Sequence, residues 1–181
     1  MLIAAAALAT ACSSSDDDND NSNPPSNPGT AQRPPTGASN VEAWLKTGAY
    51  KSWHCESAVH EARSPSPHGF NRICSNDAIS TNATGTANWP EGAAAVKELY
   101  DNAAGTTPTG YAVYLKTNAD SAAGANWYWY ERIPGNTVVA DGLGNAGVAK
   151  SLCVGCHGAA GSDAPHTPSA GGRDQVYTPV P

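Results

Sequence analysis

The stretch Cys153-Val154-Gly155-Cys156-His157 carries the residues whose types and spacing point most directly to chemistry. Two thiols separated by two residues lie about one helical turn apart, so each can add across a vinyl group of the same haem. The histidine that follows is close enough to bind the iron from the proximal side. The motif therefore predicts a covalently attached haem c, with Cys153 and Cys156 as attachment residues and His157 as the iron ligand.

The same thiol spacing occurs in thioredoxin-like redox pairs and in half zinc sites. A redox pair follows a strand in a βαβ unit, and a zinc site needs a second pair of Cys or His residues at ligand spacing. Neither context is present in the chain, so haem attachment is the favoured interpretation.

Several ligands can occupy the sixth position of such an iron. Met1 is the only methionine and belongs to the expected leader, so the His/Met ligation of electron-transfer cytochromes has no donor. A second histidine would indicate low-potential electron transfer, whereas an open site would indicate ligand binding or catalysis; a lysine is the third option. A lone histidine is more often solvated or hydrogen-bonded. The candidate histidines are His54, His60, His68 and His166.

The other three cysteines have separate expected roles. Cys55 and Cys74 are expected to form a disulfide in an oxidising compartment, which contributes about 3 kcal/mol by restricting the unfolded chain. A reactive dithiol is the alternative, but these two residues lack the Cys-x-x-Cys spacing that lowers a thiol pKa. Cys12 ends a short apolar run and is the expected lipidation site.

The first forty residues are expected to be leader and tether. Residues 1–12 resemble a bacterial lipoprotein signal, with an ordinary secretory signal as the alternative, and they fall short of the ~20 apolar residues that span a bilayer. Residues 13–40 are rich in Ser, Asn, Asp, Pro and Gly, which predicts a disordered tether. We therefore expect one folded domain over residues 41–181, extracytoplasmic and lipid-anchored to a bacterial membrane, in the periplasm or at the outer membrane.

The net charge of -6 comes without any basic stripe interleaved with aromatic residues, which argues against nucleic-acid binding.

The folded part is expected to be mainly β, an antiparallel sheet with a few short helices and a C-terminal helix that carries the haem motif. A first helix is predicted from a cap at Asn40 to Gly48, and the C-terminal helix from near Asn145. In the run from Trp127 to Tyr130, the two tryptophans and the two tyrosines should face opposite sides of a strand. The strands are predicted at residues 69–75, 94–100, 111–116, 127–132 and 137–140.

Several segments together resemble the cytochrome P460 family, which includes the cytochromes c′-beta, over residues 41–178. The haem motif is the most specific piece, and the others gain weight from their order and spacing. They are Pro67-His68-Gly69, Arg72-Ile73-Cys74-Ser75-Asn76, Trp89-Pro90-Glu91-Gly92, Val96-Lys97-Glu98-Leu99, Gly110-Tyr111-Ala112-Val113-Tyr114-Leu115-Lys116, Asn126-Trp127-Tyr128-Trp129-Tyr130 and Asp174-Gln175-Val176-Tyr177.

The resemblance implies an antiparallel β fold, often a homodimer, with one haem whose distal side is open. In the P460 members a lysine is cross-linked to the haem edge and hydroxylamine is oxidised at the iron. The matching residues are Lys97 for the cross-link, Arg72 for an arginine near the pocket and Asp120 for a distal carboxylate that assists proton removal. The expected partners are a small nitrogen compound and a redox partner protein.

Two other functions stay open. The resemblance to cytochromes c′-beta implies binding of nitric oxide or another small ligand in an apolar pocket without turnover, although Phe70 is the only phenylalanine that the chain offers for such a pocket. A tethered electron carrier with two axial histidines is the other alternative.

Overall fold

A computed structural model of the protein describes residues 33–162, 168 and 171–181. The expected signal with Cys12, the tether up to residue 32 and the candidate ligand His166 lie outside the described residues. Within the described part of the chain, no helix is long and apolar enough to cross a membrane.

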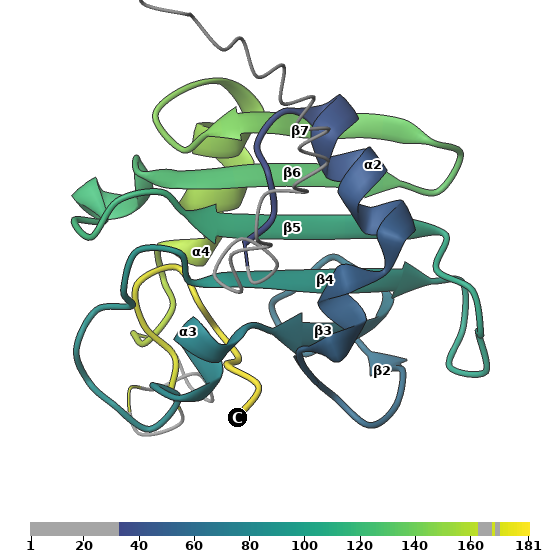
Figure 1. The fold of residues 1–181 in the computed structure, drawn as a ribbon, viewed down its shortest axis with the longest axis horizontal. Helices are drawn as coiled ribbons and strands as arrows, with labels where there is room; N and C mark the ends of the chain where they lie inside the picture. The colour runs from purple at the N-terminus through teal and green to yellow at the C-terminus, as the bar shows by residue number, and fades with distance from the viewer. Residues whose placement is uncertain (1–32, 163–167, 169–170) are drawn as a thin grey trace, which may run out of the picture.

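One antiparallel sheet of seven strands forms the centre of the domain (Figure 1). Its order is β1-β3-β4-β5-β6-β7, and β2 pairs with the same strand as β1. The strands are β1 (His54–Cys55), β2 (His60–Glu61), β3 (Phe70–Ser75), β4 (Ala94–Tyr100), β5 (Gly110–Lys116), β6 (Trp127–Ile133) and β7 (Thr137–Leu143). All five predicted strands form, and β4 has the predicted bounds.

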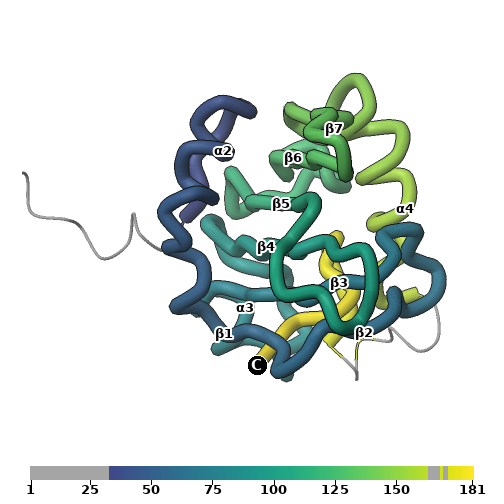
Figure 2. Tube along the Cα trace, turned by 90° about the vertical axis from the view of Figure 1, so that its right-hand side faces the viewer, coloured from purple at the N-terminus to yellow at the C-terminus, as the bar shows by residue number. Residues whose placement is uncertain are grey.

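The fold class is as predicted, because the helices are few and short. They are α2 (Ala38–Thr47), η1 (Ala49–Ser52), α3 (Asp77–Ser80), η2 (Ala122–Gly124), η3 (Ala149–Val154) and α4 (Gly155–His157). Helix α2 covers one face of the sheet, and the segment with η3 and α4 lies on the other (Figure 2).

Each face of the sheet has its own apolar core. Tyr128 and Tyr130 pack with α2 on one face of the sheet. Trp127 and Trp129 pack on the other face, which the C-terminal helix covers. The predicted alternation of this aromatic run is therefore confirmed, and it follows from the two-residue period of a strand.

Helix α2 begins earlier than predicted. Its N-cap is Gly37, and Asn40 lies inside the helix, where its amide donates to the carbonyl of Thr36 at 3.1 Å. The prediction failed because Asn40 is a favourable cap in sequence, yet the Gly37 amide is already bound to the hydroxyl of Tyr128 at 2.9 Å. The helix ends at Gly48 as predicted, with a left-handed φ of 70°.

The C-terminal helix places Cys153, Cys156 and His157 against the sheet. Residues Ala149–Val154 form π-helix, and Gly155–His157 continue as one α-helical turn. The helix approaches very closely at Gly144, where an added Cβ would lie 2.2 Å from the Gly124 carbonyl oxygen and 2.5 Å from a methyl group of Val154. Only glycine fits this position without moving the helix.

Candidate functional site

A cavity of about 560 Å³ lies between the sheet and the C-terminal helix. Its volume falls within the ~300–1,000 Å³ typical of small-molecule and cofactor pockets. Side chains from β3 to β6 form its floor, the loop from Arg63 to Gly69 forms one wall, and the C-terminal helix forms another. Most of this lining is apolar, including Ile73, Leu99, Tyr114 and Trp129.

His157 lies in the cavity wall with one ring nitrogen engaged. Its Nδ1 is 2.7 Å from the backbone carbonyl oxygen of Gln175, so Nδ1 carries the proton and donates it. Burial lowers the pKa of His157 to about 3, and the charge of Lys97 acts in the same direction. The ring is therefore neutral, with Nε2 as the nitrogen available to a metal. Its centroid is 4.7 Å from that of Trp129 and 5.3 Å from that of Tyr177.

The two thiols of the motif line the same cavity. Cys153 is half-buried, Cys156 is exposed, and neither forms a disulfide. Burial raises the pKa of the Cys153 thiol to about 11. An apolar cavity with two free thiols and a neutral histidine fits a covalently attached haem, because each group that the attachment needs is present at one wall.

Lys97 reaches the cavity from the middle of β4. Its ammonium donates to the hydroxyl of Ser66 at 3.5 Å, which is a long contact. Burial lowers the pKa of Lys97 to about 8, although the carboxylates of Glu56 and Glu131 oppose the shift. A substantial fraction of this amine is therefore neutral at mildly alkaline pH, as a nucleophilic lysine requires.

The cavity also holds a carboxylate that sequence reasoning missed. Glu131 lies 3.2 Å from Nδ1 of His68, through its Oε1, and both side chains line the cavity. The strand alternation that placed Trp129 on this face also places Glu131 there, two residues further along β6. The two-residue period of the strand would have placed Glu131 on this face from the sequence alone.

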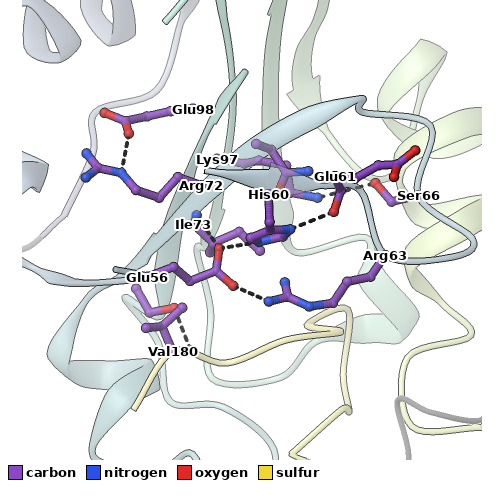
Figure 3. A network of polar contacts seen from close by, with 12 residues as sticks. Glu56, His60, Glu61, Arg63, Ser66, Arg72, Ile73, Lys97, Glu98 and Val180 are labelled. Carbon is purple, nitrogen blue, oxygen red and sulfur yellow. Dashed lines mark hydrogen bonds and ion pairs between the residues drawn. The ribbon is translucent and has the colours of Figure 1, made fainter. Parts of the chain in front are cut away.

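A second polar cluster supports the loop that forms the cavity wall (Figure 3). The Glu56 carboxylate accepts hydrogen bonds from Arg63 at 2.6 Å, from His60 at 2.9 Å and from the Ile73 amide at 2.8 Å. Burial alone would raise the pKa of Glu56, but these hydrogen bonds outweigh it and lower the pKa. The disulfide between Cys55 and Cys74 joins β1 to β3 directly beside Glu56.

The structure places two of the predicted catalytic residues away from the cavity. Arg72 pairs with Glu98 at 2.7 Å on the opposite face of the sheet, and Figure 3 shows it directed away from the contact of Lys97 with Ser66. Arg72 cannot share a face with its neighbour Ile73, which lines the cavity. The expected place of Arg72 near the pocket is therefore wrong.

Asp120 is an exposed loop residue that does not line the cavity. Its carboxylate accepts from the backbone amide of Ala122 at 2.9 Å, which is a local turn contact. The match of Asp120 to the distal carboxylate of the family therefore fails, because Asp120 lies outside the lining of the cavity.

The candidate histidine ligands also differ in whether they line the cavity. His54 pairs with Asp77 and His60 with Glu56, and neither lines the cavity. Among the candidates in the described part of the chain, His68 alone does so.

Comparison of the chain with models of known protein families gave no match, and a search of curated proteins gave none either. Within residues 33–162, 168 and 171–181, no group of three or more His, Cys, Asp or Glu side chains is arranged to hold a metal ion.

In the haem-free protein, where its amine is unmodified, Lys97 is expected to reduce the stability of the fold at neutral pH. Because its folded pKa is about 8 and its unfolded value is 10.5, the unfolded chain binds more protons between these limits, and stability rises with pH there. Lys97→Met should therefore raise the free energy of unfolding at pH 7 by about 2 kcal/mol, and the gain should shrink between pH 8 and 10.5.

Denaturant titrations of both proteins across this pH range measure the effect. Lys46→Met, at an exposed site on α2, is the matched control and should change stability by no more than about 0.5 kcal/mol. A gain that is the same at every pH would show that the charge of Lys97 is not responsible.

Proposed function

We propose that the protein is a mono-haem c-type cytochrome with an open distal iron site that oxidises a small nitrogen compound such as hydroxylamine. One observation carries the proposal: the two motif thiols, a neutral histidine with a free Nε2, and Lys97 line one cavity. Cys153 and Cys156 would hold the haem and His157 would bind its iron. The iron would supply one-electron chemistry that protein side chains lack.

The protons of the substrate need an acceptor within the cavity. Glu131 supplies it, because its carboxylate contacts His68 through one oxygen and retains further acceptor positions. His68 holds the carboxylate in place and can share the proton that it gains. The electrons pass to a redox partner protein.

Lys97 is the residue expected to bond to the edge of the haem. Its amine reaches the cavity from a rigid central strand, and its lowered pKa makes the neutral form accessible. Its long contact with Ser66 leaves it weakly held.

Optical spectra of the purified protein, resting and reduced, test the proposal beside Lys97→Ala and Glu131→Gln. We expect bound haem, a five-coordinate resting iron and a spectrum that returns to that of an ordinary c-type haem in Lys97→Ala. Hydroxylamine oxidation with a chemical electron acceptor should fall about 100-fold in Glu131→Gln, as expected for loss of a general base.

The controls for this experiment come from residues outside the cavity. His54→Ala and Asp120→Asn should leave both spectrum and rate unchanged. A protein without haem would refute the proposal, and a six-coordinate low-spin spectrum would replace it with electron transfer through two axial histidines.

Binding of nitric oxide without turnover is the second candidate. The apolar walls of the cavity, formed by residues such as Ile73, Leu99 and Trp129, favour a small uncharged ligand. This function predicts a five-coordinate iron that binds nitric oxide, yet no oxidation of hydroxylamine.

The proposed location is extracytoplasmic, with a lipid anchor at Cys12. The disulfide between Cys55 and Cys74 supports an oxidising compartment. Fractionation of the producing cells should recover the haem protein with the membranes, and recovery in the cytosol would contradict this location.

A further inference from the structure

The carbonyl group that accepts the proton of His157 lies in an unusual turn. Arg173 and Val176 bond to each other through both backbone amides, at 2.9 and 2.8 Å, and enclose Asp174 and Gln175. These two central residues have φ angles of 40° and 72°. Such left-handed angles at two successive positions favour Asn and Gly, and Gln is poorly suited to them. Tertiary contacts must therefore stabilise this turn, because the backbone preferences of its two central residues do not.

A buried ion pair meets the turn from the sheet. Lys116, at the end of β5, is fully buried, and its ammonium lies 2.7 Å from the Asp174 carboxylate. The same ammonium donates to the carbonyl oxygen of Trp89 at 2.8 Å. Arg173 anchors the start of the turn by stacking on the Trp89 ring, with its guanidinium carbon 3.5 Å from the ring centroid.

We propose that Lys116 and Asp174 are positioning residues for His157. Their ion pair fixes the left-handed turn, and the turn aims the Gln175 carbonyl group at Nδ1 of the ring. The ion pair thereby selects the tautomer and the orientation of the histidine without touching it. The effect on an iron bound at Nε2 rests on the proposed function. The effect of the ion pair on the tautomer and orientation of the His157 ring does not.

The ion pair restricts the direction of the turn as well as its place. An apolar contact holds a turn in place but tolerates small rotations, whereas a desolvated ion pair with a second hydrogen bond restricts both position and angle. A ligand histidine needs this restriction, because its outer hydrogen bond sets its basicity and ring orientation. Breaking one partner leaves an uncompensated buried charge, so the effect on stability must be separated from the effect on the ring.

Asp174→Asn is the first test variant, since asparagine tolerates the left-handed conformation while the charge is lost. In the haem protein, we expect the iron–histidine stretching band in the resonance Raman spectrum to shift to lower frequency and broaden. The reduction potential should rise, because a less firmly held acceptor makes the imidazole a weaker donor to iron.

The double variant Lys116→Met/Asp174→Asn separates positioning from stability. Removing both charges should restore much of the stability lost in Asp174→Asn, because no buried charge remains unpaired. The Raman band should stay shifted, because the anchor is absent. Recovery of the band together with stability would overturn the proposal, as would an unchanged band in Asp174→Asn.

Glu98→Gln is the matched control on the other face of the sheet. It weakens a buried ion pair with Arg72 and should lower stability without moving the Raman band. A comparable shift in Glu98→Gln would show that loss of stability alone accounts for the effect, and would also overturn the proposal.

Failure of the proposed function would be recognised separately, by the absence of a haem adduct from the intact mass of the wild-type protein. In that case nitrogen NMR of His157 measures the tautomer of its ring directly. Wild type should then show the Nδ1-protonated tautomer and Asp174→Asn a mixture of tautomers. Identical spectra for the two proteins would overturn the positioning role.

Discussion

Replacing Cys153 and Cys156 by serine in the Lys97→Ala protein, in which no bond between Lys97 and the haem can form, is expected to leave the purified protein without covalently bound haem. The prediction follows from chemistry that only the sulfurs supply, since a serine hydroxyl does not form the thioether bond. In a denaturing gel stained for haem peroxidase activity, Lys97→Ala should give a band at the mass of the chain and Lys97→Ala/Cys153→Ser/Cys156→Ser should give none.

The fold itself should survive this change. Cys156 is exposed and Cys153 is half-buried, so serine at either position buries little unpaired polar surface. His54→Ala, at an exposed residue outside the cavity, should retain the haem band. Stainable haem in the triple variant would refute the assignment of these residues.

Removal of the disulfide should give the largest loss of stability. The bond between Cys55 and Cys74 spans a sequence separation of 19 residues, and closing a loop of this size contributes about 3 kcal/mol in the chain-entropy description. Cys55→Ala/Cys74→Ala should therefore lower the midpoint of thermal unfolding by roughly 10 °C. Cys74 is completely buried in the core beneath α2, and the lost sulfur contacts add to the effect.

Calorimetry of this variant beside wild type measures the change. A reducing agent added to wild type should reproduce most of the loss, and Ser52→Ala, at an exposed residue nearby, should not. Equal midpoints for the double alanine variant and wild type would contradict the expected contribution of the disulfide.

Periodicity predicted the sheet well because the strands have two differently packed faces. The alternation from Trp127 to Tyr130 correctly separated the two tryptophans from the two tyrosines, and the residues of the haem motif line the cavity. Both features depend on local spacing, which the sequence contains. Lys97 also lines the cavity, as the family resemblance implied.

Features that depend on tertiary contacts were harder to predict. Arg72 was placed on the wrong side because its face depends on the strand register, in which Arg72 lies opposite Glu98 and Ile73 opposite Lys97. Asp120 followed from the family resemblance, which does not show where a loop side chain points, whereas Glu131 continues the alternation of β6. Lys116 and Asp174 are 58 residues apart, and nothing in the local sequence indicates that they meet.

The pairing of the strands implies an order of folding. From β3 to β7 each strand pairs with the next along the chain, so the sheet depends on local contacts and can form early. The closing segment Gly171–Pro181 instead forms hydrogen bonds with residues much earlier in the chain. The Val180 amide, for example, donates to the hydroxyl of Ser75 at a separation of 105 residues. His157 acquires its acceptor at Gln175 only when this segment docks. The ring therefore reaches its final orientation only after the closing segment has docked on the sheet.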